Sequence, residues 1–273
     1  MKTFLTLSIS CLGLALQAQI TPLPAAAHEL DSIISNAVVR AVTKEDANDE
    51  LFNNAYSYTR SRTWVYRDGS GNLKSFEKKD SYENRQLRAA QNALHPKATS
   101  PRPITTPRET ENTNSTIKGK ALKVKNFSIP NLVSRFQYTL IGQETINGRP
   151  AYIIDFVPKK HLEVHQLADH LINLGAGRVW IDEQEFAVVK GQVHIISPIS
   201  IAWGTVGELK TFTYNFTRVR TPEGYWYCDL AEWHLKAREV ILDRIVDYKE
   251  RRSNVSKITP ESLKLDLQKP SHS

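Results

Sequence analysis

The sequence predicts a mainly β fold of the α+β class. We expect a curved antiparallel sheet that forms an incomplete β-barrel, with an N-terminal helix and an internal helix packed against it. Strand-like segments follow one another at hairpin spacing, turn residues separate them, and no regular strand–helix alternation indicates a parallel sheet. The 273 residues are 40% hydrophobic and 24% charged, which is ordinary for a globular domain with one large core.

The N-terminus is typical of an export signal. Lys2 gives a positive start, and an apolar run from Phe4 to Leu16 is followed by small residues. We therefore predict a cleaved signal peptide over 1–18, with cleavage after Ala18 or, alternatively, after Ala27. An uncleaved anchor is the other interpretation, but a bilayer span needs roughly 20 apolar residues. After cleavage the protein is expected not to be transmembrane, and to be periplasmic in a Gram-negative-type envelope or secreted.

Charge and cysteine content limit the partners and the source of stability. The formal net charge is +7, and loss of Lys2 with the signal peptide leaves +6. The basic residues are scattered, and export argues against a nucleic-acid partner. Cleavage also removes Cys11, so Cys228 has no partner for an internal disulfide and the fold must be stabilised by packing.

The N-terminal part of the chain predicts a helix, a hairpin and an insertion. Apolar residues recur at helical spacing at Leu30, Ile33, Ile34, Ala37, Val38 and Ala41. Strand-forming residues over 55–67 and a weaker return strand over 73–85 flank a turn of Asp, Gly, Ser and Asn. Four prolines among polar residues predict a flexible insertion at about 95–118, within a single domain that spans 28–252.

The C-terminal half reads as a β-meander. Asn147-Gly148 favours a tight hairpin, because both residues tolerate positive φ. Residues 159–174 predict the internal helix or a long crossover, and 253–273 are expected to be a polar C-terminal tail. The strands are expected at 133–144, 149–157, 177–181, 186–196, 208–220, 225–237 and 240–250.

Several motifs together resemble one known family. They are Gly177-Arg178-Val179-Trp180-Ile181-Asp182 followed by a polar turn and Phe186-Ala187-Val188-Val189-Lys190, the hairpin over 138–152, Gly224-Tyr225-Trp226-Tyr227 and Val246-Asp247-Tyr248-Lys249. They are similar to strands of LolA-like outer-membrane lipoprotein-sorting proteins, the lipoprotein-localisation-factor superfamily. The likeness covers roughly residues 130–252. It implies an unfinished barrel whose concave apolar face holds acyl chains or a peptide. The insertion at 95–118 departs from the carrier pattern, so no particular cargo is implied.

This resemblance suggests an exported protein that binds lipid or lipoprotein acyl chains in an apolar cleft. Burying a dozen methylenes is worth on the order of 10 kcal/mol before ordering costs, at about 0.8 kcal/mol each. The alternative is an envelope protein-interaction or sensory module that binds a peptide segment of a partner protein. Aromatic strand residues are candidates to line the cleft, with ordinary core packing as the alternative for each: Trp64, Tyr138, Phe156, Trp180, Phe212, Tyr214 and Phe216.

Two arginines are candidates for contacts with charge. Arg60 and Arg62 alternate with Tyr58 and Trp64, so all four are predicted to share one face of a strand. Such a face is suited to lipid phosphates or to a partner's carboxylates. The alternative is a solvated strand face with stacked side chains, which is common on antiparallel sheets.

The sequence contains no recognisable catalytic motif, so we expect no enzyme activity and no cofactor. A nucleophile elbow is missing, and Cys228 and His234 are six residues apart on one predicted strand, roughly 20 Å, which excludes a direct dyad. His161, His165 and His170 lie close together. They are not a known zinc motif, so surface histidines are preferred and no metal site is predicted, with a metal-dependent enzyme as a third hypothesis.

Overall fold

The computed structural model describes residues 27–94, 133–160, 172–201, 207–239 and 242–268. The helices are α1 (Ala27–Thr43), α2 (Glu45–Ala55), α3 (Arg85–Leu94) and α6 (Pro260–Gln268). The strands are β1 (Tyr56–Asp68), β2 (Leu73–Glu83), β3 (Phe136–Ile146), β4 (Arg149–Pro158), β5 (Gly175–Asp182), β6 (Val188–Ile195), β7 (Ile199–Ile201), β8 (Gly207–Arg220), β9 (Trp226–Glu239) and β10 (Leu242–Lys257).

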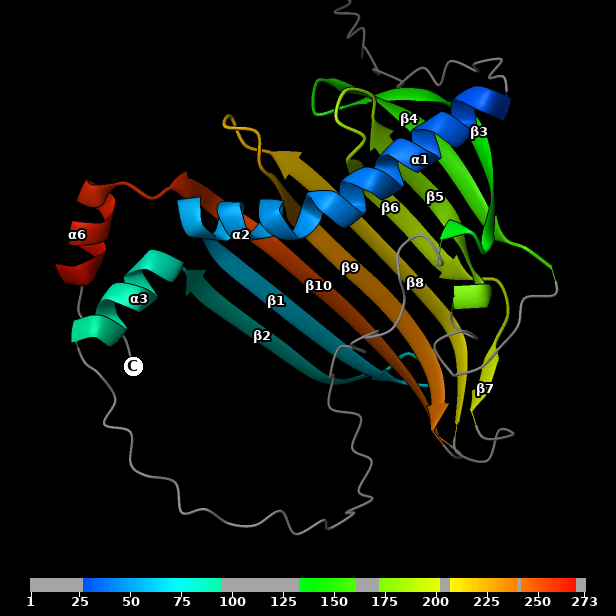
Figure 1. Cartoon of the computed structure of the whole chain (residues 1–273). Helices are drawn as coiled ribbons and strands as arrows, with labels where there is room; N and C mark the ends of the chain where they lie inside the picture. The colour runs from blue at the N-terminus through cyan, green and yellow to red at the C-terminus, as the bar shows by residue number, and fades with distance from the viewer. Residues whose placement is uncertain (1–26, 95–132, 161–171, 202–206, 240–241, 269–273) are drawn as a thin grey trace, which may run out of the picture.

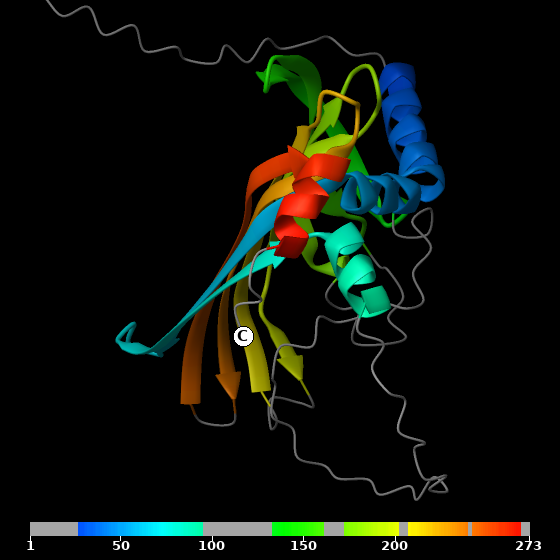
Figure 2. The ribbon, with the colours of Figure 1, turned by 90° about the vertical axis from the view of Figure 1, so that its left-hand side faces the viewer.

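The ten strands form one antiparallel sheet in the order β2-β1-β10-β9-β8-β6-β5-β4-β3, with β7 paired to β8. The sheet is curved and open, with β2 and β3 at its edges (Figure 1). Helices α1 and α2 lie on one side of it (Figure 2). The predicted class, a curved antiparallel sheet with helices packed against it, is therefore confirmed.

Several predicted features lie outside the described residues. These are the signal peptide, the insertion at 95–118, the three clustered histidines and most of the internal helix expected over 159–174. The single-domain boundary at 28–252 stays a prediction. In the described part of the chain, no helix is both long and apolar enough to cross a membrane.

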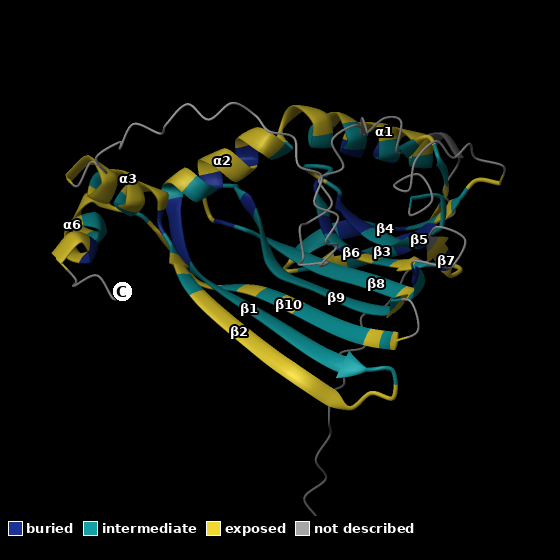
Figure 3. Cartoon of the chain, turned by 90° about the horizontal axis from the view of Figure 1, so that it is seen from below, coloured by how far each residue is buried: buried dark blue, intermediate teal, exposed yellow. Residues whose placement is uncertain are grey.

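The N-terminal helix packs on the sheet through a narrow contact. Ile33 and Ala37, one helical turn apart, are buried together with Ile154 of β4 and Ile181 of β5. The opposite side of α1 is exposed, as Figure 3 shows. Val39, for example, is 59% exposed. The predicted apolar stripe is thus the side that meets the sheet.

The short helix α2, which the sequence did not predict, is held by two buried side chains. The ring of Phe52 stacks on Tyr56 and Tyr227 at centroid distances of 5.3 and 4.8 Å. The amide of Asn48 accepts a bond from the Trp226 backbone N–H (2.8 Å) and donates to the Trp226 carbonyl (2.7 Å). Asn48 therefore takes the place of a strand partner at the start of β9.

The C-terminal segment is more ordered than the polar tail expected over 253–273. Strand β10 continues to Lys257, and α6 follows. Thr259 and Ser262 cap the start of α6 reciprocally, each backbone N–H donating to the other hydroxyl, with Pro260 at the first helical position. Asp266 accepts a hydrogen bond from the Tyr82 hydroxyl (2.7 Å), which attaches α6 to β2. The reciprocal cap and the Tyr82–Asp266 hydrogen bond thus stabilise a helix in a segment whose sequence shows no clear apolar pattern.

A buried carboxylate organises the turn between β5 and β6. Asp182 is 1% exposed and accepts two bonds from Arg149, from Nε at 2.6 Å and Nη2 at 2.8 Å. It also accepts the backbone N–H groups of Gln184 and Glu185. Burial by itself raises the pKa of Asp182, but these hydrogen bonds outweigh burial and leave the pKa below its ordinary value.

We expect Asp182→Asn to lower the free energy of unfolding by about 2 to 3 kcal/mol, because the buried carboxylate makes charge-assisted hydrogen bonds that a neutral amide cannot replace. The matched control is Asp155→Asn. Asp155 also binds an arginine with both oxygens, Arg178 at 2.5 and 2.9 Å, but its side chain is 36% exposed. That control should cost less than about 1 kcal/mol. Urea denaturation measures both free energies of unfolding. Equal losses would contradict the conclusion that the burial of Asp182 makes its ion pair the more important one.

The same pair should give a pH signature. The folded-state pKa of Asp182 is depressed, so its contribution is complete above the unfolded-state value of about 3.9 and is lost as the pH falls through the folded-state value. The stability difference between the wild type and Asp182→Asn should therefore be constant near pH 7 and shrink below about pH 4. A difference that grows on acidification would refute this account.

Candidate functional site

One face of the sheet carries an aromatic row that crosses eight strands. We call it the helix-side face, because it holds Ile154 and Ile181, which contact α1. Residues directly paired from strand to strand run as Trp64, Tyr248, Trp233, Tyr214, Val193, Gly177, Phe156 and Tyr138. Six of these eight are aromatic. Directly opposite residues in an antiparallel sheet point to the same side, so the row is continuous.

The rings of this row contact one another at its β1 end. Tyr248 lies between Trp64 and Trp233, with centroids 5.2 and 5.4 Å away. The Tyr248 hydroxyl donates to Glu250 at 2.6 Å, and burial together with that bond raises its pKa. The row therefore combines a large apolar surface with few free polar atoms.

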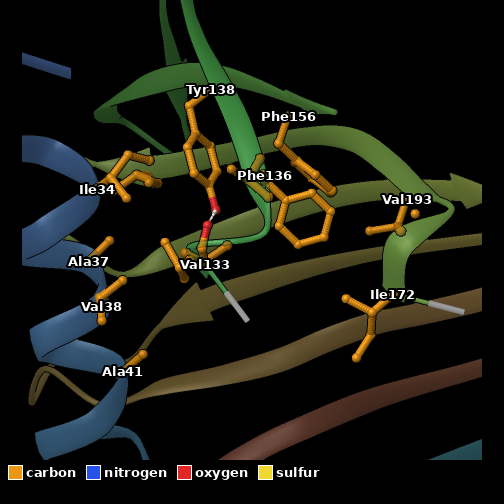
Figure 4. A pocket seen from close by; sticks show the side chains of 14 residues that line it. Ile34, Ala37, Val38, Ala41, Val133, Phe136, Tyr138, Phe156, Ile172 and Val193 are labelled. Atoms are coloured by element: carbon orange, nitrogen blue, oxygen red, sulfur yellow. Dashed lines mark hydrogen bonds between the residues drawn. The ribbon is translucent and has the colours of Figure 1, made fainter. Parts of the chain in front are cut away.

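At the other end of the row, an apolar cavity of about 460 Å³ lies between α1 and strands β3 to β6. Figure 4 shows side chains of α1 directed toward Tyr138, Phe136 and Phe156 across this space. The lining consists of Ile34, Ala37, Val38, Ala41, Val133, Phe136, Tyr138, Phe156, Ile172, Gly175, Val179, Ile181, Val188 and Val193.

Tyr138 carries the only polar side chain among these lining residues. Its hydroxyl donates to the carbonyl of Val133 at 3.0 Å, and burial raises its pKa to about 12. The hydroxyl is therefore neutral at physiological pH and already bonded within the protein. A ligand in this cavity meets methyl groups and ring faces.

Two glycines, Gly177 and Gly191, leave the helix-side face without side chains at two positions beside the cavity. A Cβ on Gly177, which lies in the row between Phe156 and Val193, would come within 2.0 Å of the Gln192 carbonyl oxygen. A Cβ on Gly191 would come within 2.3 Å of the Phe216 ring. The backbone of β6 lies too close to Gly177, and the Phe216 ring too close to Gly191, for either position to carry a side chain.

The structure places most of the predicted cleft residues on the helix-side face. Tyr138 and Phe156 line the cavity. Trp64 and Tyr214 belong to the same row, nearer β1. Phe212 and Phe216 lie two residues to either side of Tyr214 on β8, so they share its face. Their role in binding stays a prediction.

Trp180 lies on the opposite face. Its neighbours Val179 and Ile181 line the cavity, so alternation along β5 directs Trp180 away from it. The indole packs on Ala151 and Ile153 and donates to Glu144 at 2.7 Å. It therefore belongs to a separate core cluster.

The sequence did not identify α1 as one wall of the cavity. Four α1 residues line it, namely Ile34, Ala37, Val38 and Ala41. The apolar stripe of α1 was visible in the sequence. The sequence did not show that the stripe is wide enough to contact both the sheet and the cavity. Ile33 packs on the sheet, Ile34, Val38 and Ala41 face the cavity, and Ala37 does both.

The two predicted arginines lie on the helix-side face near the β1 end of the row. Arg60 forms an ion pair with Glu250 at 2.6 Å, and the guanidinium of Arg62 lies 6.0 Å from the centre of the Trp64 ring. Both are remote from the apolar cavity by several strands. They belong to the polar, basic end of this face.

The other candidate groups do not assemble into a reactive site. Cys228 and His234 lie on opposite faces of β9, because a bulge between them changes the alternation. Cys228 is the strand partner of Arg218, whereas His234 is the partner of Thr213 and forms a hydrogen bond with Asp247. Burial raises the pKa of the Cys228 thiol. Among the residues that the structure describes, no cluster of three metal-binding side chains is found.

No protein-family model and no curated protein matches the chain. Similar solved structures include a DUF1329 family protein from Desulfovibrio piger ATCC 29098, 13% identical, covering 84% of this chain and 93% of that one, with a TM-score of 0.29. A putative outer membrane lipoprotein-sorting protein domain from Vibrio parahaemolyticus is 8% identical (81% and 95% covered, TM-score 0.28). A LolA superfamily protein from Nitrosomonas europaea is also 8% identical (85% and 96%, TM-score 0.27). At TM-scores below 0.5 these likenesses carry no weight for function, which rests on the geometry above.

Gly177 and Gly191 give a test of how closely this part of the sheet is packed. We expect Gly177→Ala to destabilise the protein by about 2 to 3 kcal/mol, because its Cβ would meet backbone that cannot move independently. Gly191→Ala should cost less, since the Phe216 ring can rotate away. Denaturant midpoints for the two variants measure this, and a larger loss for Gly191→Ala would contradict the order.

Proposed function

We propose that this protein is exported to the periplasm and binds the acyl chain of a lipid or lipoprotein in the cavity between α1 and the sheet. The observation that supports this best is the cavity itself, about 460 Å³ with one polar side chain that is already bonded. Water needs two to four polar partners to occupy a cavity stably. An apolar ligand is therefore the occupant that this lining favours.

The size of the cavity is suitable for such a ligand. Small-molecule sites in proteins measure roughly 300 to 1,000 Å³. Each methylene removed from water contributes about 0.8 kcal/mol, so even a partly enclosed chain gains several kcal/mol before ordering costs. Because no described residue of the lining is charged, the chain rather than the head group is recognised here.

The α1 wall gives the site a way to adapt to its ligand. The helix contacts the sheet through Ile33 and Ala37, while Ile34 and Val38 face the cavity. A small displacement of α1 away from the sheet widens the space without breaking any strand pairing. Ligands of different chain length are therefore expected to bind at the same place.

Filling the cavity should abolish binding. Val38→Trp places a large ring in the space, and we expect it to weaken binding of the fluorescent fatty acid cis-parinaric acid by roughly tenfold or more. The matched control is Val39→Trp, the same change one residue along α1, where the side chain is 59% exposed. Fluorescence titration of the three proteins gives the comparison.

The control should bind the probe as the wild type does, and both variants should retain the wild-type circular dichroism spectrum. Equal binding by all three proteins would refute the proposed cavity. Organic extraction of the protein purified from a bacterial envelope should also release acyl chains that mass spectrometry detects. An extract free of acyl chains, together with absent probe binding, would favour the alternative of a peptide-binding envelope module.

The proposed location has its own test. Leu12→Arg places a charge in the middle of the apolar run of the predicted signal peptide, and should retain the precursor in the cytoplasm. Cell fractionation with immunoblotting measures this, and N-terminal sequencing of the exported wild type should begin at Gln19 or His28. Export of the variant at the wild-type level would exclude the signal.

A further inference from the structure

A second cavity of about 310 Å³ lies at the opposite end of the sheet, where β1 and β10 meet α2 and α3. Its lining is polar and strongly basic, with four guanidinium groups and one carboxylate. We call it the arginine cavity. Its lining residues are Asn53, Tyr58, Arg60, Glu83, Asn84, Arg85, Arg88 and Arg252.

The carboxylates around this cavity do not balance its positive charge. Arg60 pairs with Glu250 at 2.6 Å, and Arg88 pairs with Glu83. In the described part of the chain, Arg85 and Arg252 form no ion pair. With the buried Asp266, which accepts a hydrogen bond from Asn84 at 3.4 Å, three carboxylates lie in or beside this cavity against its four guanidinium groups. Positive charge is therefore in excess among the described residues.

Strand register brings two of these charges directly together. Arg60 of β1 is the cross-strand partner of Arg252 on β10. Like charges directly opposite in a sheet are destabilising. In addition, the buried Nε atoms of both side chains have no acceptor among the described residues. Glu250 offsets part of this repulsion, because it pairs with Arg60 and also interacts electrostatically with Arg252. The unpaired buried donors still carry a desolvation cost that a bound anion would remove.

The guanidinium of Arg252 is nevertheless held in a fixed position. It lies 5.0 Å from the ring centre of Tyr58 and 5.9 Å from that of Phe52. Tyr58 is fixed in turn, because its hydroxyl donates to Asn53 at 2.9 Å. Stacking on aromatic rings orients a planar guanidinium without using its hydrogen-bond donors.

Helix α3 adds positive potential from another direction. It begins at Arg85, and Asn84 caps it by accepting the Leu87 backbone N–H at 2.9 Å. Both Asn84 and Arg85 line the cavity, so the positive end of the helix dipole lies at its wall. Positive groups therefore come from β1, β10 and α3.

From this arrangement we propose that the arginine cavity binds a phosphoryl group. Guanidinium groups converging from three elements match the several oxygens of a tetrahedral phosphate, whereas a planar carboxylate offers only two. The bound anion pairs with Arg252, which has no ion pair among the described residues, and accepts hydrogen bonds from the donors that lack partners. This site is separate from the acyl-chain cavity and does not depend on it.

The key variant is Arg252→Gln, since Arg252 makes no ion pair with any described residue that its loss would leave broken. Its matched control is Arg251→Gln, which removes the same charge from the next residue of β10, on the opposite face of the strand and exposed. Isothermal titration in a buffer free of phosphate would use three probes: inorganic phosphate, dihexanoyl phosphatidic acid and dihexanoylglycerol.

We expect phosphatidic acid to bind the wild type and Arg251→Gln alike, and Arg252→Gln roughly tenfold or more weakly. Dihexanoylglycerol, which lacks the phosphate, should not show this dependence on Arg252. Arg252-dependent binding of inorganic phosphate as well assigns the site to phosphate from any source, whereas binding of phosphatidic acid alone assigns it to a lipid head group.

Equal weakening by Arg251→Gln and Arg252→Gln would overturn the proposal, because it would reduce the effect to net charge. Unchanged binding by Arg252→Gln would overturn it too. Should Arg252→Gln not fold, Arg85→Gln replaces it, since Arg85 is exposed and forms no ion pair in the described structure. Val38→Trp should leave phosphate binding unchanged, which separates this test from that of the acyl-chain cavity.

Discussion

The contact of α1 with the sheet is the constraint on which the rest of the structure depends. Ile33 and Ala37 press on two strands, while the cavity occupies the space beside that contact. The end of the helix is held by charge, because Arg40 donates to the Glu185 carbonyl at 3.3 Å and approaches its carboxylate at 3.8 Å. Glu185 also pairs with Arg220 at 2.8 Å and lies in the turn that Asp182 organises. The turn, the charge cluster and the helix therefore act as one support for the cavity wall.

The same face of the sheet borders two cavities of different lining because its side chains change along the row. Toward β3 the row carries phenylalanine, tyrosine and glycine beneath an apolar helix. Toward β1 the aromatic rings alternate with arginines, so the rings stack under guanidinium groups. Aromatic residues fit both settings, since their edges pack on aliphatic groups and their faces attract cations. A continuous aromatic row can thus join an apolar site to a basic one without a break in packing.

The fold was predictable from the sequence because alternation and turn residues are local signals. The faces were harder to assign. Trp180 was predicted to line the cleft because it is an aromatic strand residue. It alternates with apolar Val179 and Ile181 and shares its face with Arg178 and Asp182, a pattern that indicates the other side. The arginine cavity was beyond sequence analysis for a different reason. It depends on the register between β1 and β10, which are separated by most of the chain, and no local pattern reports which residues such strands will pair.

The spacing of the sheet determines how the two cavities relate. From the middle of the β1–β10 pair to the middle of the β4–β5 pair is five strand spacings, or about 24 Å at roughly 4.8 Å each. One leaflet of a bilayer has a hydrocarbon depth of about 15 Å, half of the roughly 30 Å core. An acyl chain that spans one leaflet is therefore shorter than the separation of the two cavities. The two proposed sites are consequently separate, and a substitution in one is expected to leave the other unchanged.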